Sequence, residues 1–292
     1  GRPHPNAAEF VLRTDLSRTR PRMSLNDTEI LEALHGIRVG CVRYLNARPL
    51  IEPLIDLDPK REILFEHPSR LAAALSGGRL DIALIPIYEA LRHPEYPIVD
   101  DVAIASRGEV WSVFVAWREQ PITEISLDPA SLTSANLCRL LFTHRASNPP
   151  CLVPQADASP SAARLLIGNQ AIDFRHAEGD RWHYLDLGEE WYRRTGRPFV
   201  FAAWVARDGL PGLERIAAAF RSLKQRGLTH LDTIVARHAP RYPAGFVARY
   251  LGEHIRFGLG AEEKEGIRLF RELLIDNNQL QPSVKEKPFL FA

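Results

Sequence analysis

The chain has 292 residues, about twice the length of a typical single domain, and its 37 basic and 36 acidic residues leave a net charge of +1. This balance argues against a nucleic-acid partner bound through bulk charge, because a basic face normally shows as an excess of Lys and Arg. No apolar run reaches the ~18 residues that a membrane helix needs, so we expect no membrane partner.

Residues 1–36 are predicted to form a flexible N-terminal extension. Gly1 to Arg22 is polar, rich in Arg and Pro, and lacks the apolar core of a signal peptide. Met23 is the only methionine, so we expect the natural start there and a cytoplasmic protein. The cysteines form no CxxC pair, and we expect reduced, buried thiols at Cys41, Cys138 and Cys151.

Ordered structure is expected to begin near Ile37, in an alternation of strands and helices. Short apolar runs predict strands at Ile37–Val42, Glu62–His67 and Ile82–Pro86. Two intervening helices begin at prolines and are predicted at Pro49–Leu57 and from Pro68 to Gly77. This order implies a parallel α/β sheet with right-handed connections.

Two longer apolar strands, Val110–Trp117 and Pro198–Ala206, bracket a second α/β set. That set comprises predicted strands at Ile125–Asp128 and Leu165–Gly168 and helices at Ser134–His144 and Glu189–Arg194. We expect the long strands to be the crossings between a discontinuous first lobe (37–115 and 203–280) and an inserted second lobe (116–202). Two α/β lobes of this kind are typical of proteins that close on a ligand.

The last third of the chain is predicted to be helical. Helices are expected at Leu213–Leu223, from a cap at Thr229 to His238, and at Ala261–Leu274, followed by a loosely docked tail at 281–292.

The first candidate site is the turn after the first strand, because ligands of open α/β sheets bind beyond the carboxyl ends of strands. Asn46 offers a donor and an acceptor there, and Arg48 is a cation beside a helix start. The alternative is that Asn46 only caps the helix beginning at Pro49.

The second candidate is a strand-to-helix junction that carries three hydroxyls: Ser131, Thr133 and Ser134. Hydroxyls, free N–H groups and the helix dipole together favour an anion. A plain helix cap needs only one hydroxyl, so the cluster favours anion binding. Ser112, after a glycine turn, and Asn169, at a buried strand's end, are further candidates, although an ordinary hairpin and strand end explain them equally well.

No nucleotide, metalloprotease or hydrolase motif is present, and the ten histidines show no metal spacing. We therefore expect neither a metal nor a cofactor.

Taken in order, several segments resemble the chorismate dehydratases of the futalosine-type menaquinone pathway. The resemblance runs from about Ile37 to about Leu280 and rests on Tyr44-Leu-Asn46, Leu80–Pro86 with Glu89, Ile104–Ser106 with Gly108, Ser112, Leu127-Asp128 with Ser131 and Thr133-Ser134, Leu166-Ile-Gly168, Asp186–Trp191 and Pro198–Phe201. A dihydroxynaphthoate synthase of the same pathway shares the fold, but the Tyr-Leu-Asn turn resembles the dehydratase.

The resemblance implies a periplasmic-binding-protein-like type II fold of two α/β lobes around a cleft. It implies conversion of chorismate to 3-[(1-carboxyvinyl)oxy]benzoate and water, by a hydro-lyase that is a monomer or homodimer. Asn46 is then expected to be catalytic, and the substrate to be bound by Ser112, Ser131, Thr133, Ser134, Arg48 and Asn169. The family usually has Asp where this chain has Asn169, which could alter activity.

No general base stands out. Glu89 and Asp128 are candidates, but a helix-surface residue and a turn former explain them better. Our hypothesis is that the substrate's own enolpyruvyl carboxylate takes the proton. The alternatives are a solute receptor, which predicts an export signal, and a ligand-sensing regulatory domain, which predicts a helix-turn-helix before Ile37.

Overall fold

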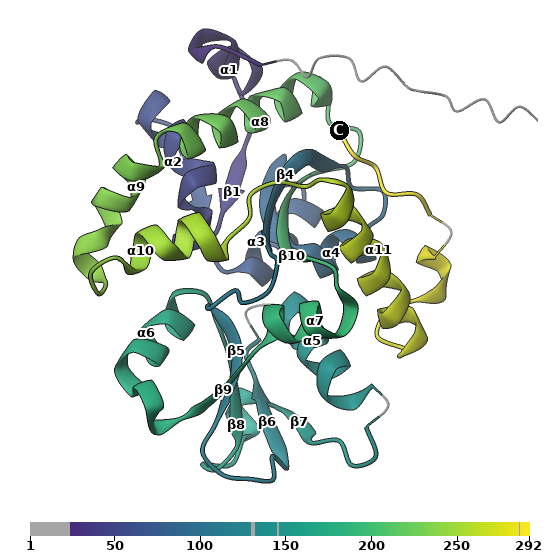
Figure 1. Cartoon of the computed structure of the whole chain (residues 1–292). Helices are drawn as coiled ribbons and strands as arrows, with labels where there is room; N and C mark the ends of the chain where they lie inside the picture. Colours follow the sequence, from purple (N-terminus) through teal and green to yellow (C-terminus); the bar gives the residue numbers. More distant parts are fainter. Residues whose placement is uncertain (1–23, 130–131, 145, 286) are drawn as a thin grey trace, which may run out of the picture.

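The computed structural model describes residues 24–129, 132–144, 146–285 and 287–292. Ser131, Met23 and the residues before Met23 therefore lie outside the described residues. The chain forms two α/β lobes, drawn one above the other in Figure 1, and each contains a five-stranded mixed sheet.

The first lobe is built on strands from two separate stretches of the sequence, 39–106 and 199–206. Its strands are β1 (Val39–Cys41), β2 (Ile63–Phe65), β3 (Ile82–Pro86), β4 (Ile98–Ser106) and β10 (Phe199–Ala206), in the order β2-β1-β3-β10-β4. β1 runs parallel to β2 and β3, as the alternation of strands and helices predicted. β10 is antiparallel to both β3 and β4.

The second lobe repeats this plan with one antiparallel strand among parallel ones. Its strands are β5 (Val113–Trp117), β6 (Glu124–Leu127), β7 (Cys151–Pro154), β8 (Ala163–Ile167) and β9 (His183–Asp186), in the order β7-β6-β8-β5-β9. β6 is parallel to β7 and β8, whereas β5 is antiparallel to β8 and β9.

Helices cover the two sheets. Those of the first lobe are α1 (Asp27–Ala33), α2 (Arg48–Leu57), α3 (Pro68–Ser76), α4 (Ile87–Arg92), α8 (Leu213–Thr229), α9 (Leu231–His238), α10 (Phe246–Arg249) and α11 (Ala261–Asp276). Those of the second lobe are α5 (Leu132–Thr143), α6 (Gly168–Glu178) and α7 (Leu187–Thr195). A 3-10 turn, Leu45–Ala47, precedes α2, and a π turn, Tyr250–His254, follows α10. Of the helices in the described ranges, none is long and apolar enough to span a bilayer.

The chain passes between the lobes in two short irregular segments, 107–112 and 196–198. β5 pairs only with strands of the second sheet and β10 only with strands of the first, among the described residues. The two long strands, β5 and β10, are therefore not the crossings that we expected. Each forms its hydrogen bonds within the sheet of a single lobe.

The N-terminal extension was expected to be flexible as far as residue 36, but its last part is folded. Asn26 caps α1, accepting from the Glu29 N–H at 3.0 Å while its own N–H donates to the Glu29 carboxylate at 2.8 Å. The apolar face of this segment buries Ile30 and Leu34. The Leu25 N–H also donates to the Ser222 hydroxyl of α8 at 2.9 Å. Capping and burial together fix α1 against the first lobe.

The C-terminal tail is also more closely held than expected. The Ile98 N–H donates to the Leu290 carbonyl at 2.7 Å, and the Ala292 N–H donates back to the Ile98 carbonyl at 2.9 Å. The tail thus pairs with the edge strand β4, whose outer backbone groups would otherwise face solvent.

Two local predictions were wrong. Thr229 does not cap α9; it ends α8, where its hydroxyl donates to the Gln225 carbonyl at 2.9 Å, and His230 joins the two helices. Cys41 and Cys138 are buried, but Cys151 is exposed, because β7 is the edge strand of the second sheet.

Candidate functional site

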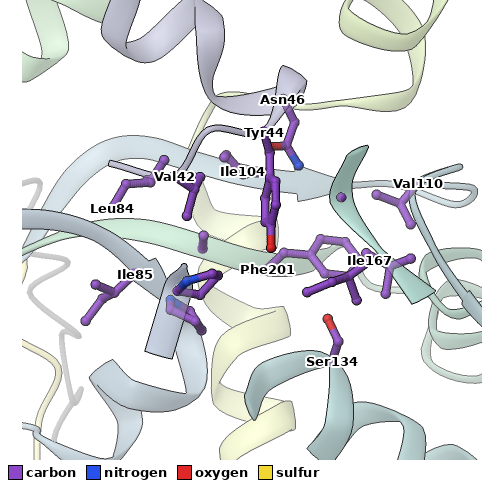
Figure 2. A pocket seen from close by; sticks show the side chains of 15 residues that line it. Val42, Tyr44, Asn46, Leu84, Ile85, Ile104, Val110, Ser134, Ile167 and Phe201 are labelled. Carbon is purple, nitrogen blue, oxygen red and sulfur yellow. The ribbon is translucent and has the colours of Figure 1, made fainter. Parts of the chain in front are cut away.

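A cavity lies between the two lobes (Figure 2), and part of it opens to solvent. The first lobe contributes the carboxyl ends of β1 and β3, and the second lobe contributes the end of β8 and the start of α5. It is lined by Val42, Tyr44, Asn46, Pro68, Leu84, Ile85, Pro86, Ile104, Val110, Val113, Ser134, Ile167, Gly168, Phe201 and Ala202. An apolar wall with a few placed polar groups suits a small organic ligand with a ring.

Asn46 supplies one of those polar groups. It lies in the turn between β1 and α2, and only 8% of it is exposed. Its Oδ1 atom has no hydrogen-bond partner among the described residues. A buried amide oxygen without a partner is costly, which is why such groups are rare outside functional sites. The oxygen is therefore placed to accept from a ligand.

A buried hydroxyl pair lies behind Asn46. The Tyr250 hydroxyl donates to the Ser112 Oγ at 2.8 Å, and neither residue is exposed by more than 1%. Burial raises the pKa of Tyr250, and this effect outweighs the opposing influence of its hydrogen bonds with Ser112 and Asn46. Tyr250 is thus a neutral donor that links Ser112, in the crossing segment, to Asn46, in the first turn.

Two hydroxyls of the predicted cluster at the start of α5, those of Ser134 and Thr133, make different contacts. Ser134 lines the cavity. The Thr133 hydroxyl instead accepts from the Tyr88 N–H of α4 at 2.9 Å, and the residue is 1% exposed. Thr133 therefore joins the second lobe to the first beside the cavity rather than in its wall.

Asn169 also joins the lobes. Its Oδ1 accepts from the Leu45 N–H at 2.8 Å, and its Nδ2 donates to the Arg43 carbonyl at 3.3 Å. Both bonds hold the turn that carries Asn46. Arg48 donates to the same Arg43 carbonyl at 3.1 Å. Asn169 and Arg48 thus surround this turn, outside the set of residues that line the cavity.

The end of β8 requires glycine at position 168. Gly168 has a φ of +59°, and a β-carbon there would lie 2.8 Å from the Tyr44 ring of the opposite lobe. Glycine adopts this backbone conformation without strain and leaves room for the ring. Burial, followed by the nearby Asp128 carboxylate, raises the pKa of Tyr44 to about 12.

Asp186 fixes the first crossing segment. Its buried carboxylate accepts from the N–H groups of Val110 (3.0 Å), Trp111 (2.7 Å) and Glu189 (3.0 Å). Trp111 has a φ of +71°, which is rare for a non-glycine residue. Burial raises the pKa of Asp186 to about 6, although the three N–H donors oppose that shift. The carboxylate therefore holds a strained backbone next to Ser112.

The two candidate bases lie apart from the centre of the cavity. Glu89 is buried, not on the helix surface as expected, and its carboxylate contacts Arg92 at 3.3 Å. Asp128 lies at the rim, in a second hollow that Tyr44 shares with His67 and Arg70. In the described part of the chain, no three His, Cys, Asp or Glu side chains are grouped to hold a metal.

Tyr250 and Thr133's partner Tyr88 illustrate what sequence reasoning missed. Tyr250 lies more than a hundred residues from Ser112, and no motif marks it. Tyr250 begins a π turn, a distortion that is common at functional sites. That turn is a property of the folded backbone, so the sequence gives no sign of it.

Residues 37–276 match a family model described as menaquinone biosynthesis. A chorismate dehydratase of Thermus thermophilus is 27% identical over 259 residues, which cover 81% of this chain and 94% of the relative. A chorismate dehydratase of Campylobacter jejuni is 28% identical over 135 residues, 46% of this chain and 49% of the relative.

Solved structures agree on the fold. A protein of Archaeoglobus fulgidus superposes with a TM-score of 0.65 at 14% identity, over 84% of this chain and 98% of its own. The periplasmic aliphatic sulphonate-binding protein of Escherichia coli gives a TM-score of 0.59 at 14% identity, over 88% and 92%. The fold is periplasmic-binding-protein-like, as the resemblance implied, and the chain belongs to the menaquinone biosynthesis family.

Proposed function

We propose that this protein is a chorismate dehydratase, which converts chorismate to 3-[(1-carboxyvinyl)oxy]benzoate and water. The family match and the two named relatives support this activity. The observation that carries it is the buried Oδ1 of Asn46, which has no partner in the described chain and lies in an apolar wall between two lobes.

The reaction is an elimination that makes the ring aromatic. Chorismate carries a ring carboxylate, an enolpyruvyl ether and an adjacent ring hydroxyl. The hydrogen on the ether-bearing carbon is acidic, because the resulting carbanion delocalises through the ring alkene into the carboxylate. Loss of that proton and of the neighbouring hydroxyl gives the aromatic product and one water.

The wall of the cavity suits three parts of this substrate. The apolar side chains contact the ring. Ser134 and the N-terminal end of α5 hold a carboxylate, since free N–H groups and the helix dipole favour an anion. The Asn46 amide oxygen accepts a hydrogen bond from the ring hydroxyl and orients it.

The enolpyruvyl carboxylate of the substrate itself serves as the base in this proposal. The two candidate carboxylates of the protein are not in the wall of the cavity: Glu89 is paired with Arg92, and Asp128 lies at the rim. A carboxylate held next to the acidic C–H needs only correct positioning, and positioning alone can supply a large part of a rate enhancement.

The test is to incubate purified protein with chorismate and to follow the products by liquid chromatography and mass spectrometry. Loss of one water, to give the enolpyruvyl-oxy benzoate, supports the proposal. Chorismate that binds but returns intact would instead favour a binding protein on the same fold. If the protein neither binds chorismate nor converts it, the proposal is contradicted.

A matched pair of variants ties the activity to the cavity. Asn46→Ala is expected to lower kcat by at least about 100-fold with little change in binding, the effect of removing an interaction made in the transition state. Asn148→Ala, at an exposed asparagine in the loop after α5 that does not line the cavity, is the control and keeps the wild-type kcat.

A further inference from the structure

Tyr44 occupies the centre of the cavity and has no role in the proposal above. It lines both the cavity and the adjoining hollow at the rim, so its side chain separates the two. In Figure 2 its hydroxyl points into the cavity, with the Asn46 amide beside the base of the ring and the Ser134 hydroxyl directed from the opposite wall. A ligand that contacts Asn46 and Ser134 must therefore contact this hydroxyl.

The ring of Tyr44 is held in place from the opposite lobe. It packs over Gly168, where a β-carbon would come within 2.9 Å of three ring atoms. The neighbouring Leu45 N–H is bonded to Asn169 at 2.8 Å, which fixes the backbone beside it. Closure of the lobes thus sets the position of the hydroxyl. Among the described residues, none forms a hydrogen bond with that hydroxyl, which leaves it available to a ligand.

The proposed dehydration requires an acid as well as a base. Hydroxide is a poor leaving group, so the departing ring oxygen must receive a proton as its bond to carbon breaks. Of the three polar side chains in the wall, Asn46 carries an amide and Ser134 an alcohol, and neither gives up a proton readily. Tyr44 carries a phenol with a pKa of about 12, still below the ~15.7 of water.

We propose that the Tyr44 hydroxyl protonates the departing ring hydroxyl, an assignment that rests on the dehydratase function proposed above. The C–H bond beside the ether breaks, its electron pair enters the ring, and the C–O bond to the hydroxyl breaks with its pair staying on oxygen. The Tyr44 O–H bond breaks as the new O–H bond forms, so water leaves and a phenolate remains. The phenolate recovers its proton from the enolpyruvyl carboxyl, which had taken the carbon's proton.

The charges around Tyr44 keep it in the required protonation state. Burial raises the pKa of Tyr44, and the Asp128 carboxylate just after β6 raises it further. His67 and Arg70, at the start of α3, are the basic side chains that line the same hollow. Because the phenol is neutral until well above pH 9, the account predicts a kcat that is insensitive to this group near neutrality.

The first test compares Tyr44→Phe with Tyr96→Phe, a control in which the tyrosine stacks on His93 and is not among the residues lining the cavity. Removing a general acid typically costs 10²–10⁴-fold, so Tyr44→Phe should lower kcat by at least about 100-fold and change KM by less than about threefold. A wild-type protein that dehydrates chorismate, together with a Tyr44→Phe kcat within threefold of it, would overturn this inference alone. A wild-type protein without dehydratase activity would overturn the proposed function, and this inference with it.

A second variant guards against a folding defect. Replacing Tyr44 by 3-fluorotyrosine keeps the ring and the hydroxyl but lowers the phenol pKa. The alkaline decline of kcat should then move to lower pH, because the acidic form is lost earlier. An alkaline limb that is identical in the two proteins would contradict a proton transfer from Tyr44.

Discussion

The link between Tyr250 and Ser112 offers a quantitative test of the geometry behind Asn46. Tyr250→Phe removes one hydroxyl and leaves the ring, which stacks on Phe246 at 5.5 Å. The Ser112 oxygen, which is fully buried, then loses its donor. A buried polar group left without a partner costs about 1–3 kcal/mol, whereas removing both partners together costs less. We therefore expect Tyr250→Phe to lower the free energy of unfolding by about 1–2 kcal/mol.

Urea unfolding of Tyr250→Phe, Ser112→Ala and the double variant measures this effect as a cycle. The two single changes are expected to be non-additive by about 1 kcal/mol, since each removes the partner of the other. Tyr242→Phe, at a half-buried tyrosine in the same aromatic group, is the control and should change stability by less than about 0.5 kcal/mol. Additive losses in the cycle would show that the 2.8 Å bond does not contribute to stability, and the reasoning would be wrong.

Three further predictions concern the contacts around the cavity. Asn169→Asp keeps the acceptor for the Leu45 N–H but removes the donor to the Arg43 carbonyl. Dehydratase assays should then show that kcat changes less than about threefold, while urea unfolding shows that the free energy of unfolding falls by about 0.5–1.5 kcal/mol. A complete loss of activity would contradict the bridging role of Asn169. Gly168→Ala forces a β-carbon against the opposite lobe, and small-angle scattering should detect a more open protein; an unchanged radius of gyration would contradict this. Burial raises the pKa of Asp186 from 3.8 to about 6, so the folded state holds its proton more tightly than the unfolded chain. The stability that this gives is complete below pH 4 and is lost as the pH rises through 6, by up to about 3 kcal/mol at ~1.4 kcal/mol per pKa unit. Unfolding free energies measured between pH 4 and 8 should fall with pH in the wild type and not in Asp186→Asn, and equal slopes would refute this.

Four of the five strands of the first sheet could be predicted because their sequences leave few alternatives, whereas β4 (Ile98–Ser106) was not predicted. Ile82–Pro86 is apolar throughout and is buried at every position, so its predicted and observed bounds coincide. The helix start of α1 was missed although Asn26 and Glu29 have the spacing of a capping box. The polar, Arg-rich stretch before Met23 indicated a flexible extension up to residue 36, and the folded helix begins within that range.

The contacts between the lobes could not be predicted in the same way. Sequence patterns place Thr133 and Asn169 at strand ends, where a ligand is the usual partner. Whether such a group faces a ligand or the other lobe depends on how the lobes close, and no local pattern encodes that. In the structure these two side chains bond to the backbone of Tyr88 and Leu45, and Asn46 and Ser134 are left in the wall.

The most direct test of the central claim is a proton NMR time course of chorismate mixed with the purified protein. If the cavity around Asn46 performs the dehydration, the signals of the cyclohexadiene ring give way to those of a 1,3-disubstituted benzene with an intact enolpyruvyl group. Under the same conditions, Asn46→Ala should leave the cyclohexadiene signals almost unchanged. Wild-type protein that leaves chorismate unaltered, or Asn46→Ala protein that converts it at the wild-type rate, would contradict the account.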